Sequence, residues 1–165
     1  MTLFRRRPSS HSHLVPRLLA GDASGEVSAI EVKRLFYGDA SSVGDARAFV
    51  RDVLAQTDAP ADVVDWAVLL VSELASNVTL HARTDLRVTV RFEGTSLWAE
   101  VKDWNTRIPQ TWPVPADATS GRGLQLLDAV ASRWGVESDP DGKTVWFSLT
   151  VDRPAGDNGR RPPTS

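Results

Sequence analysis

The sequence lacks cysteine altogether, and this absence excludes a disulfide framework, a thiolate metal site and a cysteine nucleophile. It also lacks an apolar run near the roughly 18 residues that a membrane-spanning helix needs, since its longest run is Trp66–Val71. Residues 1–20 contain arginines but no apolar stretch of the length found in signal peptides. What is present is a chain of 165 residues, 41% of them apolar, which favours one soluble, cytoplasmic domain with its own core.

The sequence also lacks a large excess of charge of one sign, since its formal net charge is −2. The charges are nevertheless unevenly distributed along the chain. Residues 1–20 carry four arginines and no acid, and residues 152–165 carry three arginines and two aspartates. The residues between them therefore have a net charge of −7, which argues against general nucleic-acid binding, since that needs basic side chains facing phosphates. The cluster Arg5–Arg7 is compatible with contact to nucleic acid or anionic lipid, but a solvated tail is the commoner role of such an arm. We expect three parts: a disordered basic arm over residues 1–27, a domain over residues 28–152 and a disordered tail over residues 153–165.

The spacing of apolar residues predicts both strands and helices. The longest predicted helix, Ala61–Ala82, has apolar residues nearly all round, which is typical of a buried helix. The longest predicted loop, Asp103–Ser120, holds three prolines and little periodicity, and long loops of this kind are usually either functional lids or disordered. The other predicted elements are a strand at Glu31–Tyr37, a helix from Ser41 or Ser42 to about Gln56, a hairpin of Leu86–Phe92 and Leu97–Val101, a helix at Gly123–Trp134 and a strand at Lys143–Val151.

This order of elements predicts the fold class. Strands joined by hairpins, together with three helices, indicate an α+β fold. We expect a two-layer sandwich in which a mixed, largely antiparallel sheet is covered on one face by the three helices. The other face of the sheet is expected to be less protected.

Polar residues inside the apolar helix Ala61–Ala82 form the first candidate site. Glu73 and Asn77 are four residues apart and therefore share a face of the helix, and His81 extends the row by a further turn. A carboxylate taken out of water needs a partner, so Glu73 has either a structural role, hydrogen-bonded or at a helix end, or a functional one. The functional role is that of a base beside an amide oxygen that ligates a hard cation such as Mg²⁺, which prefers oxygen ligands and keeps several waters.

Two further candidate features lie downstream. Asp103 ends a predicted strand where the chain enters the long loop, and a carboxylate there either accepts a hydrogen bond from an exocyclic amine such as that of adenine or forms a turn. Gly121 and Gly123 close the loop where the next helix starts, so that the backbone can approach an anion and free N–H groups favour phosphate. Their spacing fits neither a dinucleotide-binding loop nor a Walker-type loop, and glycines that merely begin a helix are the alternative.

Together these motifs resemble the ATP-binding fold shared by gyrase, histidine kinases and MutL, known as the Bergerat or GHKL fold. They resemble more closely the small anti-sigma-factor serine/threonine kinases of bacteria, and the resemblance spans about Ser41–Val151. The matching segments, in the family's order, are Ser72–Asn77 with His81–Ala82, Val101–Asp103, Gly121–Leu124 continuing through Arg133–Val136, and Gly142–Trp146. Val78 departs from the family, which usually has alanine there, and Trp104–Thr106 lack the glycines of the histidine-kinase versions.

The resemblance implies roles for individual residues. Glu73 would be the general base, Asn77 the Mg²⁺ ligand and Asp103 the acceptor for the adenine amine. Gly121 and Gly123 would shape the lid over the phosphates. Further nucleotide-binding positions that the resemblance implies are Thr144 in the adenine pocket, His81, Asn105, Arg122 and Leu124.

The activity that the resemblance implies is transfer of the γ-phosphoryl group of ATP to a serine of a STAS-type anti-anti-sigma protein. Without that antagonist, the protein would hold a sigma factor inactive, and it would bind neither nucleic acid nor membrane directly. Homodimers are common among related proteins, so a homodimer is a candidate assembly. One alternative is a nucleotide-binding module that sequesters a partner without phosphorylating it, and another is an unrelated α+β scaffold that matches by chance. Glu73 favours the enzyme, because a pure binder has no need of a base.

Overall fold

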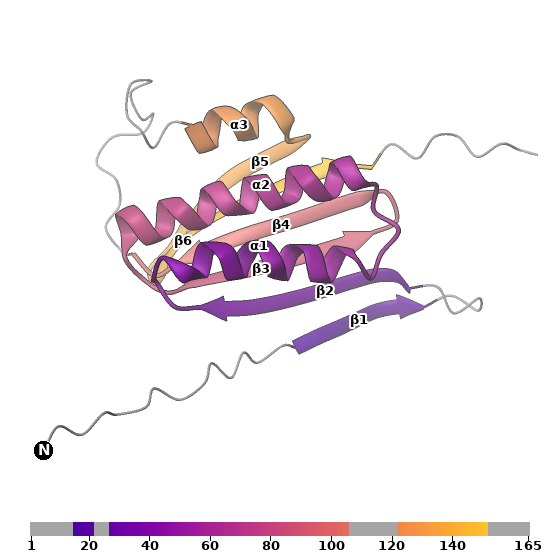
Figure 1. The fold of residues 1–165 in the computed structure, drawn as a ribbon, viewed down its shortest axis with the longest axis horizontal. Helices are drawn as coiled ribbons and strands as arrows, with labels where there is room; N and C mark the ends of the chain where they lie inside the picture. The colour runs from indigo at the N-terminus through magenta and orange to yellow at the C-terminus, as the bar shows by residue number, and fades with distance from the viewer. Residues whose placement is uncertain (1–14, 22–26, 106–121, 152–165) are drawn as a thin grey trace, which may run out of the picture.

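The described residues form an antiparallel sheet with helices packed against it (Figure 1). The structure is a computed structural model that describes residues 15–21, 27–105 and 122–151. Within these ranges six strands pair in the order β1-β2-β3-β4-β6-β5, and every pairing is antiparallel. The elements in chain order are β1 (Val15–Gly21), β2 (Val27–Phe36), α1 (Ser41–Leu54), α2 (Ala61–Asn77), the π-helical turn η1 (Val78–Ala82), β3 (Leu86–Glu93), β4 (Ser96–Asp103), α3 (Arg122–Val130), β5 (Arg133–Asp139) and β6 (Gly142–Thr150).

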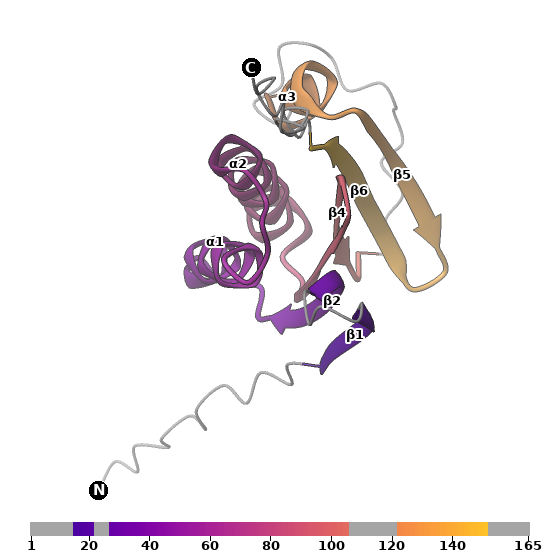
Figure 2. The same cartoon turned by 90° about the vertical axis from the view of Figure 1, so that its right-hand side faces the viewer.

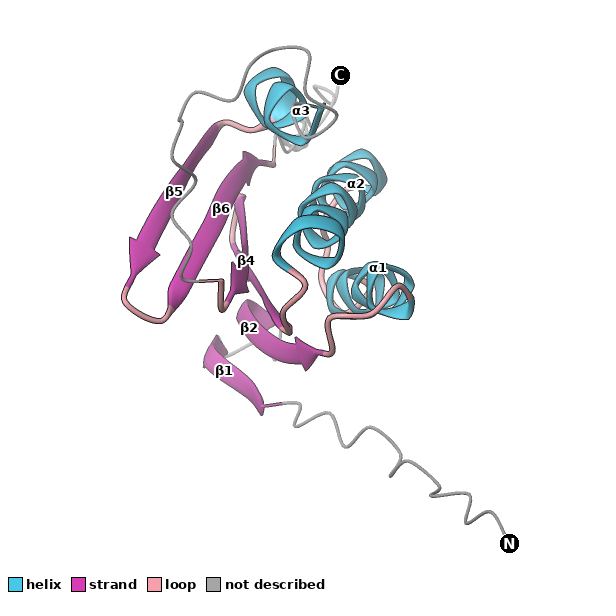
Figure 3. Cartoon of the chain, turned by 90° about the vertical axis from the view of Figure 1, so that its left-hand side faces the viewer, coloured by secondary structure: helices cyan, strands magenta, loops and turns pink. Residues whose placement is uncertain are grey.

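The helices cover one face of the sheet, and Figures 2 and 3 show α1 and α2 together on that face. Side chains alternate along β4, so that Leu97, Ala99 and Val101 point toward the helices and are buried. Phe49 of α1 and Phe147 of β6, which are almost completely buried, fill the space between the two layers. The predicted two-layer α+β sandwich is therefore confirmed, with a sheet that is antiparallel in all its described pairings.

The sheet begins earlier in the chain than the sequence indicates. The prediction of disorder over residues 1–27 is wrong for Val15–Gly21, which forms β1 and pairs with β2. β2 itself starts at Val27. Arginine and proline in and around this segment give it the composition of a tail, yet pairing satisfies backbone N–H and C=O groups along the edge of β2. Residues 1–14 and the predicted tail at 153–165 lie outside the described residues.

The predicted helix Gly123–Trp134 is too long. α3 ends at Val130, and Arg133–Asp139 forms the edge strand β5, which pairs with β6. The Trp134 side chain stays close to α3 even so, because its indole N–H donates to Asp128 Oδ1 at 2.7 Å. A short run of apolar residues fits a helix and a strand equally well. Here Arg133–Asp139 forms a strand because it pairs with β6.

α2 is the central helix of the core, but it is not buried on all sides. Its buried residues are Val63, Ala67, Val68, Leu70, Val71, Leu74 and Ala75. Trp66 and Leu69, by contrast, are 41% and 40% exposed. The segment Ala61–Ala82, which joins α2 and η1, is long and apolar enough to cross a membrane by length and composition alone. In this structure its apolar stripe packs in the hydrophobic core with residues of the sheet.

The start of α1 is stabilised by a carboxylate that precedes the helix. Asp39 Oδ1 accepts hydrogen bonds from the backbone N–H groups of Ser41 at 3.0 Å and of Ser42 at 3.2 Å, and from the Ser41 hydroxyl at 2.6 Å. The hydroxyl of Ser41 is the main cause that lowers the pKa of Asp39 below its ordinary value of 3.8. The ionised carboxylate therefore stabilises the first turn of α1, where N–H groups lack partners within the helix.

We predict that Asp39→Ala lowers the melting temperature at neutral pH, because the first turn of α1 loses its acceptor. The pKa of Asp39 is lowered in the folded state, so its stabilisation is present above 3.8 and is lost as the pH falls through the folded-state pKa. The difference in melting temperature between wild type and Asp39→Ala, measured by circular dichroism, should therefore shrink as the pH falls below 3.8. A difference that stays constant over this range would show that the charge of Asp39 contributes nothing.

Candidate functional site

The C-terminal half of α2 carries two polar side chains on one face. Glu73 and Asn77 lie one turn apart, and both are half-buried. Glu73 is thus less removed from water than its apolar neighbours in the sequence indicate, because this stripe of α2 faces the start of α3 rather than the sheet. Neither side chain has a hydrogen-bond or ion-pair partner among the described residues.

A single π-helical turn follows Asn77. η1 closes with a hydrogen bond from the Arg83 N–H to the Val78 carbonyl oxygen at 2.8 Å, and Arg83 then adopts a left-handed φ of 54°. His81 is exposed on this turn. His81 is therefore more open to water than Glu73 and Asn77, which are half-buried. π turns are rare and occur frequently at functional sites.

The start of α3 lies directly against Glu73 and Asn77. A Cβ placed on Gly123 would be 3.1 Å from Asn77 Nδ2 and 3.6 Å from the Cβ of Glu73, and Gly123 is itself buried. The first and third sequence motifs therefore meet in space. Since the first N–H groups of a helix have no partner within it, backbone donors lie next to a carboxylate and an amide.

Asp103, at the end of β4, is the only acidic residue that is buried among the described residues, with 2% of its side chain exposed. Its Oδ1 accepts a hydrogen bond from the Asn105 N–H at 2.9 Å. Its Oδ2 lies 3.6 Å from Lys143 Nζ. Asp103 continues the row of Leu97, Ala99 and Val101, so its carboxylate lies on the face of the sheet that the helices cover.

The start of β6 holds Lys143 beside Asp103. The two residues are directly opposite each other in the pairing of β4 with β6. A Cβ on Gly142 would overlap the Asp103 carbonyl oxygen, so only glycine permits β6 to begin so close to the end of β4. The sequence analysis missed Lys143. Alternation counted back from the apolar positions Phe147 and Val145 would have placed it on the covered face.

The elements that carry these side chains meet at one end of the molecule. In Figure 1, α2 and β4 end and α3 begins on the same side. Hydrogen bonds tie the connecting segments together there: the Trp104 N–H donates to Thr84 Oγ1 at 3.3 Å, and the Gly38 N–H donates to Asp85 Oδ1 at 3.1 Å. The segment that follows η1 is therefore anchored both to the end of β4 and to the chain before α1.

The strand register does not bring Thr144 to this end of the covered face. Thr144 pairs with Lys102, and both side chains project from the face of the sheet opposite that of Asp103. The role in the adenine pocket that the resemblance implies for Thr144 stays a prediction, and in this register Lys143 is the residue of β6 that shares a face with Asp103. On that opposite face Lys102 Nζ lies 2.6 Å from Asp139 Oδ2, and this contact is the main cause that lowers the pKa of Asp139 below 3.8.

The remaining predicted residues have diverse positions. Leu124 is partly buried and packs against the core. Arg122 is the first residue of α3, and Gly121 lies outside the described residues. Asn105 is close to the site through its backbone, which donates to Asp103.

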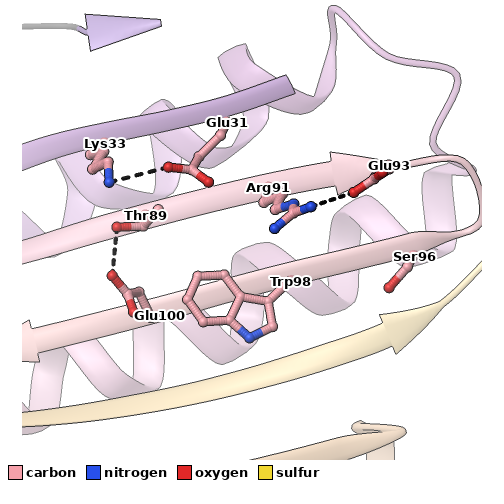
Figure 4. A pocket seen from close by; sticks show the side chains of 8 residues that line it. All are labelled: Glu31, Lys33, Thr89, Arg91, Glu93, Ser96, Trp98 and Glu100. Atoms are coloured by element: carbon pink, nitrogen blue, oxygen red, sulfur yellow. Dashed lines mark hydrogen bonds and ion pairs between the residues drawn. The ribbon is translucent and has the colours of Figure 1, made fainter. Parts of the chain in front are cut away.

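A separate polar hollow lies on the uncovered face of the sheet (Figure 4). Its lining residues are Glu31, Lys33, Thr89, Arg91, Glu93, Ser96, Trp98 and Glu100. The charges in it are paired with one another: Lys33 Nζ lies 3.1 Å from Glu31 Oε1, and Arg91 Nη2 lies 2.5 Å from Glu93 Oε2. The Thr89 hydroxyl donates to Glu100 Oε1 at 2.8 Å. None of the three predicted motifs contributes a residue to this hollow.

Comparison with known proteins decides the family. Residues 36–149 match the family model of the histidine kinase-like ATPase domain. The chain belongs to this family. The matched stretch of this histidine kinase-like ATPase domain runs from the end of β2 to β6 and includes all the site residues described above.

Three known proteins are similar to this ATPase domain to different extents. An uncharacterised protein of Streptomyces coelicolor is 53% identical over 47 residues, which are 27% of this chain and 45% of that protein. The crystal structure of the RsbU and RsbW domains of Rv1364c from Mycobacterium tuberculosis has a TM-score of 0.60 at 20% identity, over 76% of this chain and 33% of that one. A blue-light activated histidine kinase of Erythrobacter litoralis EL346 has a TM-score of 0.46 at 19% identity, over 67% of this chain and 41% of that one. The likeness to the mycobacterial structure shows a shared fold, and this chain spans less than half the length of each relative.

Membership of an ATPase-domain family implies that the chain binds ATP. The residues present fit a nucleotide, because backbone donors at the start of α3 suit phosphates and a buried carboxylate suits an amino group. Asn77, whose side chain lies beside the start of α3, carries an amide oxygen of the kind that hard cations accept as a ligand. Over the described residues, no group of three His, Asp or Glu side chains is arranged to hold a metal ion.

We predict that Gly123→Leu weakens ATP binding about tenfold or more, equivalent to roughly 1.4 kcal/mol. A side chain at this position would displace Asn77 and fill the space beside the start of α3. ATP should lose more affinity than ADP, because the terminal phosphate is expected at this end of the site. Isothermal titration calorimetry with both nucleotides measures the effect.

The matched control for this substitution is Gly44→Leu. Gly44 is exposed on α1, and a Cβ there would have no neighbour within 4 Å, so nucleotide affinity should not change. Equal losses for ATP and ADP in Gly123→Leu would contradict the placement of Gly123 beside the terminal phosphate.

Proposed function

We propose that this chain is an ATP-dependent serine/threonine protein kinase that also acts as an anti-sigma factor. It phosphorylates a serine of a STAS-type anti-anti-sigma protein, and in the absence of that antagonist it holds a sigma factor inactive. The observation that carries most weight is the packing of Gly123 against Glu73 and Asn77, with the buried Asp103 at the same end of the molecule. Family membership supports the nucleotide part of the proposal.

Each of these residues has a chemical role in the proposal. Asp103 accepts a hydrogen bond from the adenine amine, the backbone around Gly123 binds the phosphates, and Asn77 ligates Mg²⁺. Mg²⁺, when bound, neutralises charge on the phosphates. Glu73 takes the proton of the substrate serine hydroxyl while the serine oxygen bonds to the γ-phosphorus, and the bond to the bridging oxygen breaks to leave ADP. Because phosphoryl transfer needs mainly positioning and charge neutralisation, few side chains have to be catalytic.

The second candidate function is a nucleotide-binding module that sequesters its partner without phosphorylating it. Glu73 favours the kinase. Its carboxylate is half-buried, yet it has no hydrogen-bond or ion-pair partner within the described ranges. A carboxylate without a partner is free to accept a proton, whereas one that only stabilises the fold would normally be hydrogen-bonded.

The proposed partners are a STAS-domain protein and a sigma factor, in the cytoplasm. The structural likeness to a chain that contains an RsbW domain supports this at the level of the fold. A homodimer is the proposed assembly to test, and the proposal includes no direct contact with nucleic acid or membrane.

We predict that Glu73→Ala reduces phosphoryl transfer by about 10²–10⁴-fold, the usual contribution of a positioned general base. Transfer of radiolabel from γ-labelled ATP to candidate STAS proteins measures this rate, and calorimetry should show that ATP still binds. Glu137→Ala, at an exposed acid of β5, is the matched control and should leave transfer unchanged. Transfer unaffected by Glu73→Ala would remove Glu73 from the mechanism. Absence of transfer in wild type, despite ATP binding, would favour the module.

We also predict that Asp103→Asn weakens ADP binding by at least about tenfold, because a hydrogen bond to a charged group contributes roughly 1.5–3 kcal/mol. The melting temperature of the nucleotide-free protein should change little, since the asparagine oxygen can still accept from the Asn105 N–H and Lys143 is 32% exposed to water. Asp45→Asn, at an exposed position of α1, is the control. A collapse in melting temperature together with unchanged affinity would contradict a role in base binding.

A further inference from the structure

Lys143 supplies a positive charge next to the buried carboxylate Asp103. Its Nζ lies 3.6 Å from Asp103 Oδ2, and its side chain is 32% exposed, against 2% for Asp103. A separation of 3.6 Å is an ion pair, but it is longer than the roughly 2.7–2.9 Å of a charge-assisted hydrogen bond. The ammonium group therefore keeps N–H donors that Asp103 does not use.

The backbone fixes Lys143 on this side of the sheet. Lys143 pairs with Asp103 in the register of β4 and β6, and Gly142 allows close approach of the two strands. The neighbouring lysine, Lys102, cannot take its place, because it projects from the opposite face and is paired there with Asp139 at 2.6 Å. Among the described residues, Lys143 is thus the positively charged partner of Asp103.

A hydrogen-bond acceptor beside a hydrogen-bond donor, as in Asp103 and Lys143, matches adenine better than guanine or hypoxanthine. Adenine presents an amino group as donor and, next to it, the unprotonated ring nitrogen N1 as acceptor. Guanine and hypoxanthine present the reverse order, a carbonyl acceptor and an N1–H donor. A carboxylate is acceptor-only and an ammonium is donor-only. If Asp103 accepts from the amino group, Lys143 is the adjacent group that can donate to N1.

We propose that Lys143 donates a hydrogen bond to N1 of the adenine ring and so determines the base specificity of the site, an inference that rests on the proposed nucleotide binding at Asp103. Lys143 keeps its ion pair with Asp103 in the nucleotide-free protein and shares its donors between Asp103 and N1 when a nucleotide is bound. Asp103 alone would recognise an amino group, whereas the pair recognises an amino group with an unprotonated neighbour.

The test compares ADP with 1-deaza-ADP, in which a C–H group replaces N1 and the amino group is kept. Affinities of both are measured by calorimetry with Mg²⁺ for wild type, Lys143→Met and Lys102→Met. Wild type should bind ADP about tenfold or more tightly than 1-deaza-ADP, as expected for a hydrogen bond from a charged donor. Lys143→Met should bind the two equally, and Lys102→Met, a matched loss of charge on the opposite face, should keep the wild-type ratio.

The ratio is measured within each protein, so a change in stability does not affect it. Equal binding of ADP and 1-deaza-ADP by wild type overturns the role of Lys143, whether or not the variants fold. A wild-type ratio that persists in Lys143→Met overturns it as well, because another group would then contact N1. Failure of wild type to bind ADP at all would overturn the proposed function, and the role of Lys143 with it.

Discussion

The close approach of α3 to α2 is the constraint on which the site depends. α3 has only nine residues, and a helix of that length is marginal in isolation, so packing has to hold it in place. Leu127 is completely buried and contributes about 1.5–3 kcal/mol through burial of its side chain. The Trp134 indole, bonded to Asp128, holds the other end of the helix next to the sheet. With both anchors in place, the backbone of Gly123 packs against the side chains of Asn77 and Glu73.

A second close approach builds the other half of the site. At Gly142 the backbone of β6 comes so near to the carbonyl of Asp103 that any side chain would collide with it. The Asp103 carboxylate at the end of β4 is buried, and it forms an ion pair with Lys143. Both halves use a glycine to bring backbone against a polar residue, and both lie at the end of the sheet where strands and helices terminate. Such an end suits ligand binding, because unpaired backbone groups and side chains of several elements converge there.

The sequence predicts those parts of the fold in which the pattern of apolar residues fits only one type of secondary structure. The hairpin of β3 and β4 alternates regularly, and α1 has an unbroken helical spacing, so both are found where expected. β1 escaped prediction because arginine and proline mask a strand that depends on pairing with β2. The end of α3 was misjudged because Trp134 fits either a helix or a strand until β6 is placed beside it.

The geometry of the candidate site, too, is predicted only in part from the sequence. The spacing of Glu73 and Asn77 correctly gives a shared helix face, because a helix has a fixed period. How far the pair is exposed depends on α3, which no local pattern reveals. The face on which Thr144 lies is not given by its motif, because a motif identifies a residue type near a position, whereas the pleat of the strand assigns alternate residues to opposite faces.

The apolar composition of α2 has a consequence for how the chain folds while it is being synthesised. The segment Ala61–Ala82 is apolar enough to pass for a membrane helix, and it leaves the ribosome before β4 and β6, the strands it packs against. Until Phe147 has been synthesised, the stripe from Val63 to Ala75 lacks part of its cover and is open to chaperones or to other nascent chains. Truncation of the chain before β6 would therefore leave a protein that aggregates, rather than a smaller version of the same fold.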